Sequence, residues 1–101
     1  MNILDITILN TSASRVLARA DVHFEGNHVR DEGFHVKGFK IFRDEKTGKE
    51  YVTPPSYLAG KYWRPLFRLD SADEWHTLQA QIIEAYNNKL IEESMKENNM
   101  H

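Results

Sequence analysis

Residues 33–56 contain the pattern that most constrains the fold of this chain. Two apolar runs lie on either side of a polar turn centred on residues 46–48, with glycine at position 48. Apolar runs joined by a short turn that contains glycine are typical of a β-hairpin. A hairpin alone is marginally stable in water, so one of its faces has to be covered by other elements. The rest of the chain must supply that cover, and the second face stays available for another role.

The first run of this hairpin changes phase at Gly38. Phe34 and Val36 share one parity along the strand, whereas Phe39 and Ile41 share the other. A β-bulge at Gly38 would place all four side chains on one face, and glycine tolerates such a bulge best. The solvated face would then carry His35, Lys37, Lys40 and Phe42.

Residues 15–24 show the clearest strand pattern in the sequence. Apolar residues from Val16 to Phe24 occupy every second position, and mostly polar residues alternate with them. A period of two predicts a strand with one buried face and one solvated face. Ala18 and Ala20 lie at the centre of the buried face. Such small side chains leave room for a bulky partner, most simply a helix that carries aromatic residues.

The other predicted strands are short. Proline cannot donate to a β-ladder, so it ends a strand or restricts it to the edge of a sheet. The segments are residues 3–9, residues 50–53 ahead of Pro54-Pro55, and, after a loop over residues 56–63, a short edge strand over residues 64–69 that contains Pro65.

A long amphipathic helix is predicted from Ser71 to about Lys96. Ser71 and Glu74 have the spacing of a capping box, and acidic residues in the first turn favour the positive end of the helix dipole. One apolar stripe follows at three- and four-residue spacing, formed by Trp75, Leu78, Ile82, Ala85, Tyr86 and Leu90. The predicted fold is therefore α+β, an antiparallel meander of four to five short strands with one long C-terminal helix packed on one face. Residues 1–96 form a single domain, and residues 97–101 form a frayed tail.

The length and composition exclude several classes of protein. A chain of 101 residues is expected to form one domain with a modest core. It has no cysteine, which excludes disulfides, thiolate zinc sites and cysteine nucleophiles. The first residues lack the features of a signal peptide, and no apolar run approaches the ~20 residues of a membrane span. A cytoplasmic location without membrane contact is expected.

Charge is distributed unevenly along the chain. Residues 1–69 hold eleven Lys/Arg and eight Asp/Glu, whereas residues 70–101 hold two and seven. Residues 37–68 hold eight bases and three acids. A basic centre with an acidic end is one footprint of nucleic-acid binding. Taken alone, the charge distribution favours the simpler interpretation of a solvated hairpin and a solvated helix.

Catalytic and metal-binding constellations are absent from the sequence. The Gly48-Lys49 pair lacks both the glycine five residues earlier and the hydroxyl residue that a P-loop requires. His23, His28 and His35 match no familiar spacing of zinc ligands. No nucleophile is placed beside a base, so the chain is not expected to be an enzyme or to hold a metal or other cofactor.

Residues 57–68 combine aromatic and basic side chains. Lys61 and Arg64 flank Tyr62 and Trp63. Aromatic faces stack on unpaired bases and neighbouring cations pair with phosphates, a combination typical of proteins that bind single strands. The alternative is that Tyr62 or Trp63 closes the edge of the core against the helix.

The order of these segments resembles the SpoVG family, small bacterial regulators linked to sporulation and septation. No single motif is highly specific, and the match rests on order and spacing over roughly residues 3–90. It is carried by Ile6-Thr7-Ile8, the strand Arg15–Phe24 with its central alanines, Val36-Lys37-Gly38-Phe39-Lys40-Ile41, Tyr51-Val52-Thr53-Pro54-Pro55-Ser56, Gly60-Lys61-Tyr62 and Ile83-Glu84-Ala85-Tyr86.

The resemblance implies an antiparallel sheet with a C-terminal helix, a homodimer formed through strand contacts, and regulation by binding DNA or RNA without catalysis. Two positions depart from the family. Family members usually carry a basic pair directly after the Pro-Ser motif, where this chain has Tyr57 and Leu58. The start of the helix, commonly basic in the family, is acidic here over residues 70–74. The fold is therefore implied more strongly than the nucleic-acid binding.

Two hypotheses follow from the sequence. In the first, the chain is a homodimeric regulator that binds DNA or RNA. Lys61, Arg64 and Arg68 would contact phosphate, Tyr57 and Trp63 would stack on bases, and Lys37, Lys40 and Lys49 would be secondary contacts. In the second, the chain is a protein-interaction module that uses an exposed sheet edge and its acidic helix, without nucleic acid.

Overall fold

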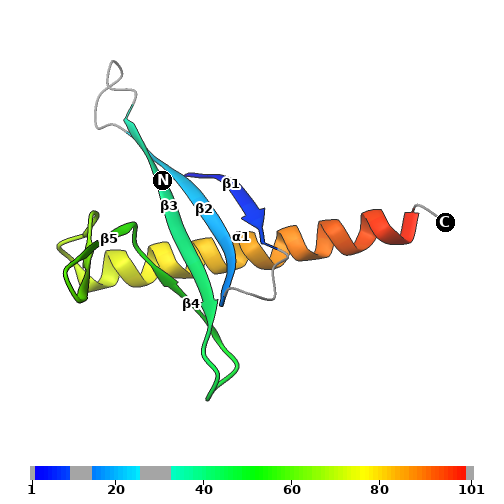
Figure 1. Cartoon of the computed structure of the whole chain (residues 1–101). Helices are drawn as coiled ribbons and strands as arrows, with labels where there is room; N and C mark the ends of the chain where they lie inside the picture. Colours follow the sequence, from blue (N-terminus) through cyan, green and yellow to red (C-terminus); the bar gives the residue numbers. More distant parts are fainter. Residues whose placement is uncertain (1, 10–14, 26–32, 100–101) are drawn as a thin grey trace.

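The computed structural model describes residues 2–9, 15–25 and 33–99 (Figure 1). Within these residues the chain forms six strands and one helix. The strands are β1 (Asn2–Ile8), β2 (Val16–Phe24), β3 (Phe34–Arg43), β4 (Glu50–Thr53), β5 (Ser56–Ala59) and β6 (Tyr62–Pro65), and the helix is α1 (Ala72–Asn99).

The first four strands form an antiparallel sheet in the order β1-β2-β3-β4, which is a meander. Helix α1 crosses one face of this sheet and contacts β1 and β4 (Figure 1). The predicted α+β fold class is confirmed. No helix within the described residues is long and apolar enough to span a membrane.

The core lies between the sheet and α1. Ala18 and Ala20 of β2 are completely buried, as are Leu78 and Ile82 of the helix. The other buried apolar residues are Ile6, Val22, Phe39, Ile41, Val52 and Tyr86. The two alanines thus face a helix, as predicted, although the deepest helix residues are aliphatic. Leu90, the last residue of the predicted stripe, is 36% exposed and lies beside β1 at the margin of the core.

The predicted bulge at Gly38 is confirmed. Opposite β2, the register passes from the pair Ala20–Phe39 to the pair Asp21–Lys37, which leaves Gly38 without a partner position. Gly38 has a φ of 99°, a region that L-residues with a side chain rarely adopt. The extra residue restores the phase of the strand, because a one-residue shift moves every side chain to the other face.

The segment after Pro55 differs from its prediction. A loop over residues 56–63 and a strand over residues 64–69 were expected, but β5 and β6 form a separate two-stranded hairpin over residues 56–65. Ala59 pairs with Tyr62, which leaves Gly60-Lys61 as a two-residue loop. Gly60 has a φ of 63°, as the first central position of a type II′ turn requires.

Helix α1 begins as predicted and ends later than predicted. The Ser71 hydroxyl accepts a hydrogen bond from the backbone N–H of Glu74 at 3.4 Å, which is the expected capping contact. The helix runs to Asn99 rather than to about Lys96. The frayed tail proposed for residues 97–101 stays a prediction, since positions 100 and 101 lie outside the described residues.

Candidate nucleic-acid interface

The face of the sheet opposite α1 carries charged and aromatic side chains. Directly opposed residues of neighbouring strands share one face of a sheet. Arg19 of β2 is opposite Lys40 of β3, and Asp21 is opposite Lys37. Lys40 is in turn opposite Thr53 of β4. Arg19, Lys40 and Thr53 therefore form a row across three strands on this open face.

A groove of about 530 Å³ lies on the open face beside the β5–β6 hairpin. Its walls come from β3, β4 and the two strands of the hairpin. It is lined by Lys40, Phe42, Tyr51, Thr53, Pro54, Ser56, Trp63 and Pro65. Aromatic rings and proline rings make most of this surface apolar, and Lys40 is its one charged group.

Two aromatic features dominate the groove. The rings of Phe42 and Tyr51, opposed across β3 and β4, stack with their centroids 5.4 Å apart and 13° between their planes. The ammonium of Lys40 lies 5.8 Å from the centroid of the Trp63 ring, within the usual range of a cation–π contact. This contact joins the sheet to the hairpin and places a cation against an indole that is 64% exposed.

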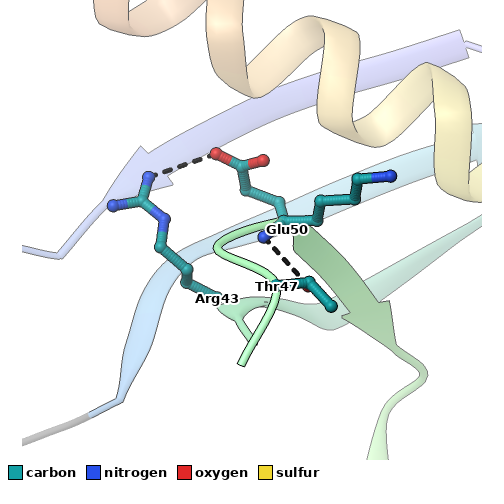
Figure 2. A network of polar contacts seen from close by, with 4 residues as sticks. Arg43, Thr47 and Glu50 are labelled. Carbon is teal, nitrogen blue, oxygen red and sulfur yellow. Dashed lines mark hydrogen bonds and ion pairs between the residues drawn. The ribbon is translucent and has the colours of Figure 1, made fainter. Parts of the chain in front are cut away.

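The cations around the groove differ in their partners. Arg43 forms a salt bridge with Glu50 at 3.1 Å, and Figure 2 shows the two side chains facing each other above the turn that contains Thr47. Arg15 pairs with Glu45 at 3.2 Å. In the described part of the chain, Arg19, Lys37 and Lys40 form no salt bridge. Arg19 and Lys40 are thus the neighbouring charges that stay available to an anionic ligand.

The structure brings together two of the predicted site residues, Lys40 and Trp63. Tyr57 and Arg64 pair with each other across the hairpin. Tyr57 is next to Leu58 in the sequence and Arg64 is next to Trp63, and Leu58 pairs with Trp63. Because successive side chains of a strand point to opposite faces, Tyr57 and Arg64 lie on the opposite face of the hairpin from Trp63. The two residues that were expected to stack on bases therefore face different sides of the hairpin.

The remaining predicted contacts are dispersed. Lys61 lies in the turn between β5 and β6, and Arg68 follows β6, both exposed. Lys37 is opposite Asp21, which offsets its charge. Lys49 lies in the turn between β3 and β4, where its backbone N–H donates to the Thr47 hydroxyl at 3.2 Å (Figure 2). None of these four lines the groove.

Sequence reasoning missed Phe42, Tyr51 and Arg19 as site residues. Phe42 was expected on the solvated face, but its aromatic partner was not identified. The signal was available in the register, because pairing the core residues Ile41 and Val52 places Phe42 opposite Tyr51. Aromatic side chains that meet on the exposed face of two adjacent strands form an apolar patch, which is a common feature of binding surfaces.

Two histidines also meet on the open face. His23 and His35 are opposed across β2 and β3, with ring centroids 4.7 Å apart and 81° between the planes. His28, the third histidine of the sequence, lies outside the described residues. Among the residues that the structure describes, no group of three side chains could hold a metal ion.

Comparison of the chain with protein-family models, with curated proteins and with solved structures gives no match in any of the three. The groove and its surroundings are therefore interpreted from their own chemistry.

Proposed function

We propose that this chain is a non-enzymatic regulatory protein that binds nucleic acid, DNA or RNA, through the open face of its sheet. The observation that carries the proposal is the Lys40–Trp63 contact in the lining of a groove that also contains the stacked Phe42–Tyr51 pair. Cations beside exposed aromatic rings provide both attraction to phosphate and faces for bases. The resemblance to the SpoVG family supports the same function, and suggests sporulation or septation as the regulated process and the bacterial cytoplasm as the location.

A binding titration at two salt concentrations tests this proposal. Contacts from Arg19 and Lys40 to two phosphates of a single strand predict a loss of about 7-fold in affinity between about 50 and 200 mM salt. Lys40→Gln should reduce this salt dependence. Lys96→Gln, on the distant end of α1, is the matched control and should leave it unchanged. Failure to bind any single-stranded or duplex DNA or RNA at low salt would refute the proposed function.

We also propose that the protein acts as a homodimer through the β5–β6 hairpin. Within the described residues, β5 and β6 pair only with each other, and a two-stranded hairpin alone is marginally stable in water. Leu58, Tyr62 and Leu66, in the hairpin and directly after it, are large apolar side chains that are more than half exposed and that the ligand groove does not use. Pairing with the hairpin of a second copy would cover part of this surface and would give hydrogen-bond partners to the backbone groups on the free edges of β5 and β6.

The mass of the protein in solution tests the dimer. Light scattering should give twice the chain mass, and the double variant Leu58→Lys/Leu66→Lys should give the mass of one chain. Leu90→Lys, an exposed apolar position on α1, is the control and should stay dimeric. A wild-type protein that stays monomeric at high concentration would show that the hairpin surface has another purpose.

A second candidate function is a protein-interaction module. The C-terminal half of α1, which continues beyond the sheet, exposes Leu90, Ile91 and Met95 next to acidic residues. This amphipathic surface suits a partner that presents an apolar groove with basic edges. Co-purification with a protein partner that survives nuclease treatment would favour this function over the first.

A further inference from the structure

The groove on the open face has features that distinguish between forms of nucleic acid. We propose that it holds an unpaired base of a single-stranded nucleic acid, stacked against the Phe42–Tyr51 pair with the Trp63 ring as a further wall. The protein would accordingly prefer single strands to duplexes. This inference rests on the proposed function and adds to it the class of ligand and the residues that select it.

The size and chemistry of the groove suit a nucleobase. Its volume of about 530 Å³ lies within the range of about 300–1,000 Å³ that is usual for sites of small ligands. The aromatic rings offer faces for stacking, and the hydroxyls of Thr53 and Ser56 lie in the lining. No hydrogen bond to another described residue occupies either hydroxyl. A hydroxyl both donates and accepts, so these two groups can meet the edge of any base.

The concave shape excludes a paired base. In a duplex the faces of the bases are stacked on one another, and only their edges are accessible in the grooves. A protein surface reaches the face of a base only where the base is unpaired and turned out of the stack.

The charges next to the groove mark a path for the phosphates. Phe42 and Tyr51 line a second hollow of about 410 Å³, which also contains Arg15, Arg43 and Lys46 together with Asp44 and Glu45. The aromatic pair therefore separates the groove from a hollow in which Lys46 is the cation without a salt bridge to a described residue. A base stacked on this pair would have Lys40 on one side and Lys46 on the other. Phosphates lie on both sides of every internal nucleotide of a strand, which matches this arrangement.

A proline-rich peptide is the other ligand that such a groove could take. Peptides in the polyproline conformation dock into grooves lined by aromatic side chains. The neighbouring Arg19 and Lys40 favour the nucleic acid, because a neutral peptide would leave both cations without a partner. The two ligands differ in their dependence on salt, since only the nucleic acid releases counterions on binding.

The test compares a labelled oligothymidylate with a duplex hairpin of the same length by fluorescence anisotropy at low salt. Single strands are expected to bind more tightly than the duplex. Trp63→Ala and Tyr51→Ala should each weaken single-strand binding by about 5- to 150-fold, the usual effect of removing one stacking partner. Trp63→Phe, which keeps an aromatic face, should recover most of the affinity. Tyr57→Ala is the matched control and should bind as the wild type does, because Tyr57 lies on the other face of the hairpin.

A second readout reports on the groove directly. The chain has two tryptophans, so Trp75→Phe leaves Trp63 as the single indole. Oligothymidylate should quench the fluorescence of that variant along the same titration curve as the anisotropy. Circular dichroism of each variant establishes that it is folded under the conditions of the assay.

The possible results separate the two proposals. Salt-dependent binding that is equal for single strands and duplexes, and unchanged by Trp63→Ala and Tyr51→Ala, overturns the groove assignment and leaves the proposed function standing. An equal loss in Tyr57→Ala also overturns it. A proline-rich peptide that binds independently of salt and is lost in Trp63→Ala would show that the groove is a peptide site. The absence of binding to every nucleic acid removes both proposals.

Discussion

Replacement of Gly38 tests the bulge on which the core depends. A Cβ at this position would lie 3.8 Å from Cβ of Pro55, which is an ordinary van der Waals distance, so alanine causes no clash. The cost comes from the backbone, because φ is 99°. Left-handed conformations cost an L-residue about 1–2 kcal/mol. Gly38 lies beyond the centre of that region, so the cost is expected at or above the upper end of this range.

The unfolded chain offsets part of this cost. Alanine has less conformational freedom than glycine when unfolded, which stabilises the folded state by about 0.4–1 kcal/mol. We therefore expect Gly38→Ala to lower the free energy of unfolding by about 1–2 kcal/mol. In a domain of this size, that corresponds to a fall in Tm of roughly 5–15 °C. Gly38→Asn should cost less, because asparagine tolerates positive φ, and Gly38→Val should cost more.

Urea denaturation followed by tryptophan fluorescence measures this series. Trp75 reports on the core, since its ring stacks near Phe39 with the centroids 6.5 Å apart. Gly60→Ala is the matched control, with a φ of 63° and open space around the new Cβ. Its strain lies in a hairpin outside the main sheet, so the free energy of global unfolding should stay unchanged. A Gly38→Ala variant as stable as the wild type would refute the reasoning about the bulge.

Three further substitutions test other parts of the fold by the same denaturation assay. Ile82→Ala creates a cavity in the core, where Ile82 is fully buried, and should cost about 2–5 kcal/mol with an unchanged m-value. Ser71→Ala removes the helix cap and should cost about 1 kcal/mol, whereas Ser71→Gly should cost only a few tenths. Gln79→Ala removes the acceptor of the Val52 N–H, bonded at 3.3 Å to the Gln79 side chain, and should cost about 1 kcal/mol and speed hydrogen exchange at Val52.

The elements that could be predicted are those whose causes are local. The alternation over residues 15–24 predicts β2, the phase change predicts the Gly38 bulge, and the Ser71–Glu74 spacing predicts the start of α1. Each of these depends on a periodicity or a backbone conformation that a few neighbouring residues determine. The structure confirms all three.

The β5–β6 hairpin escaped prediction because its sequence has no alternation of apolar and polar residues. Tyr57, Leu58, Tyr62 and Trp63 are all large, so no face is distinguished by hydrophobicity. The remaining signal was Gly60-Lys61, a pair that fits a two-residue type II′ loop. The site depends in turn on the direction in which this hairpin leaves the sheet. Lys40 and Trp63 meet across a tertiary contact that no local pattern encodes.

Pro55 connects the bulge to the groove. Its carbonyl accepts a hydrogen bond from the backbone N–H of Leu66 at 2.7 Å, which ties together the entry and exit of the β5–β6 hairpin. Its ring faces the position that a Cβ of Gly38 would occupy. The bulge that restores the phase of β3 therefore also leaves the space into which Pro55 packs, directly before the hairpin that carries Trp63.

Because Pro55 contacts the bulge, substitutions at Gly38 can change the stability of the fold and the affinity for single strands independently. Alanine meets Pro55 at an ordinary contact distance, so the folded variant should keep its affinity for single strands despite its lower stability. Valine adds two methyl groups beyond that Cβ and should displace Pro55, so its affinity should fall even at temperatures where the variant is fully folded. Anisotropy titrations below the unfolding transition measure both. Equal affinities for the two folded variants would show that the position of the hairpin does not depend on the bulge.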